Sequence, residues 1–504
     1  MAKGDSVYER LTGGNRKQRK ELQRRLQSDD PGLELVHRNA AGIDIGNESH
    51  FVSVPPGRDS EPVREFGSWT ADLNRMAEWL ISCRIDTVAM QSTGVYWFAV
   101  YDVLEKHGVK VFLVNASHTK NLPGRKTDVL TTGVADASAC QGIRSIIGLR
   151  PRPSQWLMKL HTYGLLRNSF RPPEDIRPIR AVWRLRERHV QDAGRSVQHM
   201  QKALTSMNIQ LANAISDIVG VSGQKIIRAI LAGERDSWKL AALRDRGVKA
   251  STEEVARSLE GNWQDDQLFE LQQAVNEYDF RQQQILECDG KLQGYLSTLP
   301  TRPTPVADPG SVPPPASGKK KKAKNTKVGN APKSFDLAAE MRRVTGVDAF
   351  RVEGLGVMTI QTVVSELGTE LGEHWPTEQH FASWLGLSPK RDVSGGKVIR
   401  HARDKNRNRV AGVLRLAAST LLRSDSYLGA RFRNLRMRLG APKAIKAMAR
   451  HLACIIYRLF TKGQEWVDRG AEQFEQNRQV RQLALLHAKA EAAGFRLVPA
   501  AHSA

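Results

Sequence analysis

The segment from Ala41 to Gly46 constrains this 504-residue chain most, because it places one carboxylate, Asp44, in a short apolar run flanked by glycines. A second run of strand-forming residues, Phe51 to Val54, follows after a short polar turn, so the two segments predict a β-hairpin. A lone charge on a central strand costs several kcal/mol unless another group pairs with it. We therefore expect Asp44 either to hold a cation at the end of the sheet or to close a turn by accepting a backbone N–H bond.

Strands and helices alternate along the next part of the chain. The sequence predicts a helix over 71–83, a strand over 86–91, a helix over 95–107 and a strand over 109–114. A hairpin followed by helix-separated strands predicts a mixed α/β sheet of the ribonuclease-H type. In that architecture, acidic groups from separate strands converge on one edge of the sheet.

The charge balance favours a polyanionic partner. The chain has 76 Lys and Arg against 53 Asp and Glu, a formal net charge of +23, and many basic side chains are best suited to neutralising phosphates. Four widely separated cysteines contain no CxxC pair, which excludes a recognisable zinc site or disulfide framework and favours a cytoplasmic protein. No segment has the apolar length of a signal core or a membrane span, so no membrane partner is expected.

Heptad spacing predicts a long coiled-coil arm. One apolar line over 181–219 consists of Val190, Val197, Leu204, Leu211 and Ile218, and a parallel line consists of Ala193, Met200, Met207 and Ala214. A second long helix supplies Leu271, Tyr278, Ile285 and Leu292. The two helices could pair within one chain or between two copies, and the spacing does not decide between these alternatives.

A proline-rich and lysine-rich stretch over 300–332 predicts a disordered basic linker. The domain that follows is predicted to be helical. Its residues Val352 to Gly356, ahead of an apolar helix, weakly indicate a helix-hairpin-helix turn whose backbone N–H groups could hold a phosphate.

Several motifs together resemble one known family. Gly42 to Gly46, Gln91 to Trp97, Val114 to Ala116 and Gly124 to Asp128 follow one another as in the RuvC-like DEDD transposases of bacterial insertion sequences. Members of this family carry a second, serine-bearing domain, which the segment Phe381 to Lys397 resembles, and the better-known members are recombinases guided by a bridge RNA.

The resemblance implies an acidic Mg²⁺ site, in which Asp44 matches the first of four carboxylates and Asp128 the third. Gln91 stands where the family has Glu, and Thr131 stands where the fourth carboxylate is expected. Residues 131–153 have no counterpart in the family pattern and read as an insertion. Asp136 lies inside it, about 12 Å along the axis from Asp128 if the segment is helical, so only a sharp bend could bring it to the metal.

The resemblance also implies that Ser394 is the nucleophile that attacks DNA. Basic residues near the two sites are expected to contact nucleic acid: Arg125, Lys126, Lys397, Arg400, Arg403, Lys405 and Arg407.

The predicted organisation is a basic arm over 1–36, a RuvC-like domain over 37–180, a coiled-coil arm over 181–299, a linker over 300–334, a serine-bearing domain over 335–465 and a helical tail over 466–504. The predicted function is a DNA transposase or site-specific recombinase of an insertion sequence. Its expected partners are DNA ends and target DNA, a structured guide RNA and further copies of the chain, as a dimer or tetramer in the bacterial nucleoid.

Two alternatives remain open. Gln91 and the insertion would leave a nucleic-acid-binding relative of the family with impaired catalysis. Alternatively, the glycines at 42 and 46 could form the phosphate loop of an actin-like or sugar-kinase ATPase, which the basic charge and the lack of a second phosphate-binding motif disfavour.

Overall fold

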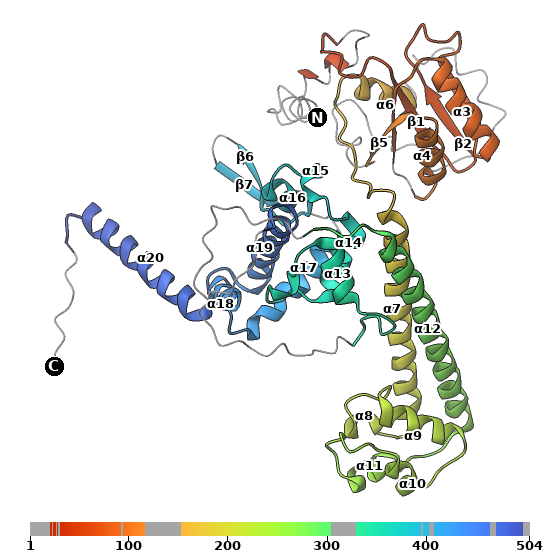
Figure 1. Cartoon of the computed structure of the whole chain (residues 1–504), viewed down its shortest axis with the longest axis vertical. Helices are drawn as coiled ribbons and strands as arrows, with labels where there is room; N and C mark the ends of the chain where they lie inside the picture. The colour runs from red at the N-terminus through yellow and green to blue at the C-terminus, as the bar shows by residue number, and fades with distance from the viewer. Residues whose placement is uncertain are drawn as a thin grey trace. The chain divides into compact units, whose positions relative to one another are not determined.

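The computed structural model divides the chain into two compact units, Met1–Arg171 and Pro172–Ala504, which are described separately (Figure 1). The structure describes residues 21–22, 24–26, 28, 31–91, 94–115, 153–303, 329–394, 397–402, 408–463 and 470–496.

The first unit contains a five-stranded mixed sheet in the order β3-β2-β1-β4-β5. Its strands are β1 (Ala40–Ile45), β2 (Ser49–Ser53), β3 (Val63–Gly67), β4 (Thr87–Gln91) and β5 (Lys110–Val114). The first three strands are antiparallel neighbours, whereas β4 runs parallel to β1 and β5 parallel to β4. The predicted hairpin and the two later strands are therefore confirmed, and the order is consistent with the expected ribonuclease-H-type sheet.

Helices cover both faces of this sheet. Alternate residues Ala41 and Ile43 of β1 pack with α3 (Thr70–Ser82) and α4 (Trp97–Lys106) in one apolar core. The opposite face, with Ala89 and Val114, packs against α6 (Pro153–Thr162). Both predicted helices α3 and α4 are confirmed. The polar edge strand β3 was missed, because its residues are at most half-buried and lack apolar alternation.

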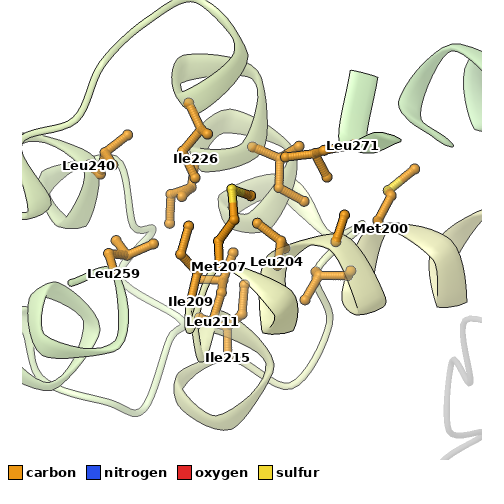
Figure 2. Packing of buried hydrophobic residues seen from close by; sticks show 14 of the residues in the cluster. Met200, Leu204, Met207, Ile209, Leu211, Ile215, Ile226, Leu240, Leu259 and Leu271 are labelled. Carbon is orange, nitrogen blue, oxygen red and sulfur yellow. The ribbon is translucent and has the colours of Figure 1, made fainter. Parts of the chain in front are cut away.

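In the second unit, two long helices, α7 (Ile176–Ser206) and α12 (Asp265–Thr298), pack against each other along their lengths, yellow against green in Figure 1. Short helices close the tip: α8 (Leu211–Ala214), α9 (Val221–Leu231), α10 (Ser237–Ala242) and α11 (Thr252–Ser258). Their apolar residues form one core with the end of α7, including Met200, Met207 and Leu271 (Figure 2).

The first heptad helix is shorter than predicted: α7 ends at Ser206 and does not continue to residue 219. Asn208 has a positive φ of 56°, which a helix cannot contain. Leu211 and Ile218 are nevertheless buried, but they belong to the tip core. The two long helices pair within one chain, while pairing between copies stays a prediction.

The remaining elements build a mainly helical domain. They are α13 (Leu337–Thr345), η1 (Ala349–Arg351), α14 (Val357–Leu367), α15 (Leu371–His374), α16 (Glu378–Trp384), β6 (Lys390–Ser394), β7 (Lys397–Ala402), α17 (Arg409–Thr420), η2 (Leu421–Arg423), α18 (Tyr427–Leu439), α19 (Ala441–Lys462) and α20 (Gly470–Ala492). The antiparallel hairpin of β6 and β7 corrects the expectation of a purely helical domain.

Ion pairs attach this domain to α7. Glu366 of α14 is almost buried and lies between Arg180 and Arg184, with a bidentate contact from Arg184 at 2.7 Å on both oxygens. The indole N–H of Trp183 donates to the Thr362 hydroxyl at 3.2 Å. Among the described residues, no helix is apolar over a length that could cross a bilayer.

Candidate active site

The strand register brings Asp44 and Gln91 to one edge of the sheet. Parallel pairing of β1 and β4 runs to Ile43 opposite Met90, so Asp44 and Gln91 are the next residues of their strands. Neighbouring strands lie ~4.8 Å apart, and the two residues follow the same alternation, so both side chains leave the same face. The predicted convergence of these two positions is therefore present in the structure.

Gly42 determines how closely α6 approaches this face. A Cβ at this position would lie 2.1 Å from the Ser154 carbonyl oxygen and 2.4 Å from the Met158 backbone nitrogen. Glycine is therefore required for α6 to lie directly on β1. The buried hydroxyls of Ser53 and Ser154 hydrogen-bond at 2.7 Å and fix the same contact.

Beside Asp44 the surface is hollowed. Asp44 is half-buried, as is Gln91, and the hollow is lined by Asp44, Ile45, Gly46, Asn47, Glu48, Ser49 and Phe51. Glu48 adds a second carboxylate that sequence reasoning did not single out. Its signal was its place in the turn between β1 and β2, four residues after Asp44.

Buried histidines do not add positive charge to this face. His161 of α6 bonds the Thr87 hydroxyl at 2.9 Å, and burial together with nearby His37 lowers its pKa to about 3. Burial also lowers the pKa of His37 and of His50. All three rings are therefore neutral at pH 7 and add no positive charge near the acidic edge.

The available donors are the oxygens of a carboxylate and of an amide, the ligand types that Mg²⁺ prefers. Within the part of the chain that the structure describes, no three His, Cys, Asp or Glu side chains gather as a metal site. Asp128, Thr131, Asp136, Arg125 and Lys126 lie outside the described residues, as does the insertion up to residue 152.

Ser394 lies at the end of a strand. It is the last residue of β6 and pairs with Lys397, the first residue of β7, so two glycines separate the strands. The register shifts between Asp392 and Val393, and Asp392 pairs with Arg400. A β-bulge beside a turn is a common way to re-aim a functional residue. Arg403, Lys405 and Arg407 lie outside the described residues.

Two helices flank the hairpin along the chain. Thr377 caps α16 by accepting from the His380 N–H, and Asn408 caps α17 by accepting from the Ala411 N–H at 3.2 Å. Both are N-caps, which fix where α16 and α17 begin; the hairpin lies in the sequence between the end of α16 at Trp384 and the start of α17 at Arg409. The candidate nucleophile is therefore placed on a short hairpin between two well-defined helices.

Comparison with known proteins gives two matches in the chain. Residues 41–134 match the family model for DEDD transposases of the IS110 type, and residues 350–433 match the model described as the transposase IS116/IS110/IS902 family. No curated protein matches the chain. The first match includes Asp44, Gln91 and Asp128, and the second includes Ser394. Both matches support a transposase or recombinase function in general, and they confirm the resemblance found in the sequence: residues 41–134 and 350–433 are similar to the DEDD domain and the C-terminal transposase domain of the IS110 family.

Proposed function

We propose that this protein cuts and rejoins DNA, with Ser394 as the nucleophile and a divalent cation at the Asp44 edge. The observation that carries the proposal is the placement of Asp44 and Gln91 on adjacent carboxyl ends of β1 and β4, in a segment that matches a DEDD transposase domain. A DNA substrate also fits the net charge of +23.

Asp44 and Gln91 would hold the cation together with Asp128, with Asp136 as the candidate fourth ligand. Bound there, Mg²⁺ would polarise the scissile phosphate. The chain's own contribution is positional: β1 and β4 fix two oxygen donors side by side, and α6 closes one face over Gly42.

Ser394 would attack the scissile phosphorus through its hydroxyl oxygen. A serine–phosphate ester forms, the bond to the leaving deoxyribose oxygen breaks, the serine proton passes to solvent and the leaving oxygen takes up a proton. Lys397 and Arg400 would offset the charge that develops on the phosphate. Rejoining reverses the same step with the hydroxyl of another DNA end.

The test incubates the full-length protein with its flanking DNA and Mg²⁺ and measures covalent protein–DNA adduct after denaturation. Ser394→Ala should abolish the adduct and leave DNA affinity nearly unchanged, because the hydroxyl attacks and does not hold the DNA. Ser419→Ala is the matched control, since Ser419 is exposed on α17 of the same domain and bonds only its own helix at Leu416. An adduct that persists in Ser394→Ala would assign the nucleophile to another residue.

A second candidate function is nucleic-acid binding without catalysis, and Gln91 favours it. An amide at this position removes one negative charge from a site that must bind a dication. We expect Gln91→Glu to raise Mg²⁺ affinity by about tenfold in calorimetric titration. An adduct that forms only in this variant would assign the parent to the binding function, whereas full adduct formation in the parent would exclude it.

Guide RNA and self-association belong to the same proposal. A structured RNA fits the basic charge as DNA does, and co-purification of a defined RNA species with the tagged protein would identify it.

A further inference from the structure

Exposed apolar side chains gather at the same edge of the sheet as Asp44. In the described part of the first unit, six large apolar side chains are exposed: Leu35, Trp69, Ile81, Val95, Tyr96 and Phe98. Three of these follow one another within four residues, with exposed fractions of 68% for Val95, 45% for Tyr96 and 49% for Phe98. We call these three residues the aromatic platform.

Topology places the platform at the same end of the sheet as Asp44 and Gln91, whose side chains leave the opposite, α6-covered face. β4 ends at Gln91 and α4 begins at Trp97, so the platform occupies the connection between them and the first turn of α4. Gly94 has a φ of +57°, the left-handed conformation that turns the chain from the strand into the helix. α4 packs on the Ile43 face and α6 on the opposite face, so the platform borders the edge from the α4 side.

The ring of Phe98 is supported by a neighbouring ring. Phe98 stacks on Trp97 with centroids 4.1 Å apart and an angle of 20° between the planes. Trp97 contacts Tyr101 edge-on at 6.0 Å, and the Arg171 guanidinium lies over the Tyr101 ring at 3.7 Å. Arg171 in turn pairs with Asp102 at 2.5 Å. The exposed face of Phe98 is therefore presented by a fixed support.

Local helix chemistry does not explain the aromatic residues. Tyr96 is the N-cap residue of α4 and makes no capping hydrogen bond, although Ser, Thr, Asp or Asn would stabilise this position by about 1 kcal/mol. Tyr96 and Phe98 also leave about half of their surface outside the core. Flat exposed rings are the groups on which proteins stack bases of single-stranded nucleic acid.

We propose that Tyr96 and Phe98, with Val95, form a stacking site for unpaired bases of the DNA strand whose phosphate lies at the Asp44 edge. This inference rests on the proposed function, because it takes DNA as the substrate of that edge. The platform would hold a base turned out of the duplex next to the scissile phosphate, and would bind any base through its flat face.

The test measures the affinity of full-length protein for a fluorescent single-stranded oligonucleotide, for its duplex and for the same strand with abasic sites, all without divalent cation. Tyr96→Ala and Phe98→Ala should each weaken binding of the intact strand by about tenfold, because one stacked base contributes ~1–3 kcal/mol. Neither should change binding of the abasic strand. Tyr96→Phe and Phe98→Tyr keep a flat ring and should bind as the parent does.

Ile81→Ala is the matched control, because Ile81 is 47% exposed at the far end of α3, away from the Asp44 edge. Equal losses for intact and abasic strands, or a change in sedimentation instead of affinity, would overturn the stacking site. The outcome is independent of catalysis: Ser394→Ala should retain the base-dependent binding even if no adduct ever forms.

Discussion

Gly42 shows how one residue supports the acidic edge without taking part in chemistry. Any side chain here meets backbone atoms of α6 at 2.1 Å and 2.4 Å, and backbone cannot move aside as a flexible side chain can. The sequence indicated that glycines surround Asp44, and the structure gives the reason for the one at 42.

We predict that Gly42→Ala lowers the free energy of unfolding of the first unit by about 3 kcal/mol, because the added methyl group overpacks the contact between β1 and α6. Urea unfolding read by limited proteolysis of residues 31–115 measures this change. Gly194→Ala on α7 is the control, because its Cβ meets no atom within 4 Å. It should be neutral or add about 0.5–1 kcal/mol.

Buried His161 makes the first unit sensitive to acid. Its pKa is lowered to about 3 in the folded chain, chiefly by burial, while an unfolded histidine titrates near 6.5. Between these values the unfolded state binds the extra proton, so stability is full above pH 6.5 and falls as the pH drops towards 3. Burial lowers the pKa of His37 and His50 as well, which adds to the same trend.

We predict that the free energy of unfolding of this unit falls by ~1.4 kcal/mol per pH unit between pH 6.5 and about 3 because of His161. His161→Phe removes one titrating group, so it should reduce the pH dependence of the free energy of unfolding by ~1.4 kcal/mol per pH unit. The lost hydrogen bond to Thr87 lowers stability equally at all pH values and does not change the slope. Urea titrations at several pH values, read by the same proteolysis, measure the slope. An unchanged slope in this variant would contradict the attribution of the acid sensitivity to His161.

At the scale of elements, the periodic apolar spacing predicted correctly which residues are buried, but it did not predict where helix α7 ends. Leu211 and Ile218 continue the heptad lines of α7 and are buried as expected, yet they pack in the tip after the helix has ended. Heptad spacing of apolar residues indicates which residues face a core, but several short helices can share one core. The positive φ at Asn208 carries no strong signal in sequence.

The β6–β7 hairpin escaped prediction because its strands carry few apolar residues in alternation. Val393, Val398 and Ile399 are its only large aliphatic residues. The two glycines between Ser394 and Lys397 were the available signal, since Gly-Gly is a hairpin turn sequence. The candidate site was thus predictable where a buried strand fixed it, at Asp44 and Gln91, and less so where mostly polar residues form a short hairpin.

Glu366 forms the ion pairs that attach α14 to α7. It is 5% exposed, and Arg180 and Arg184 are its partners. We predict that Glu366→Gln destabilises the second unit by about 2–4 kcal/mol, because the buried carboxylate is lost and two partly buried arginines lose their counter-charge. Glu475→Gln is the control, since Glu475 and Arg478 form a surface pair on α20 and should contribute less than about 1 kcal/mol. Thermal unfolding measures both variants, and equal effects would contradict the role of Glu366.

A second ionic contact lies deeper in the same unit. Arg186 of α7 and Asp289 of α12 pair in a fully buried position, and Arg186 also donates to the Asn330 carbonyl oxygen at 2.9 Å. The long helices and the segment after the linker therefore meet at one charged position. We infer that this pair helps to specify the register of the two helices, because a buried ion pair often adds little net stability.

For the whole molecule, the pairing of α7 with α12 within one chain leaves a different surface for association between copies than the sequence suggested. The apolar lines that sequence analysis offered for self-association are already buried within one chain: Leu271, Ile285 and Leu292 lie against α7 and the tip. The outer surface of α12 retains Phe269 and Phe280, 66% and 56% exposed and about three helical turns apart on one side. A competing apolar surface on α20 consists of Val480, Leu483 and Leu486.

We predict that self-association uses the outer side of α12. Its two exposed phenylalanines are aligned on one side of a long helix, and α7 of the same chain already packs against the other side. The double variant Phe269→Ser with Phe280→Ser should sediment as a smaller species than the parent at equal concentration, while circular dichroism stays unchanged. Leu483→Ser with Leu486→Ser is the matched control on α20 and should leave the sedimentation coefficient as it is. The reverse result would move the interface to α20, and a monomeric parent would remove self-association from the proposed function. Because the phenylalanines lie far along the chain from both Asp44 and Ser394, any loss of DNA rejoining in the first variant would measure how far catalysis depends on assembly.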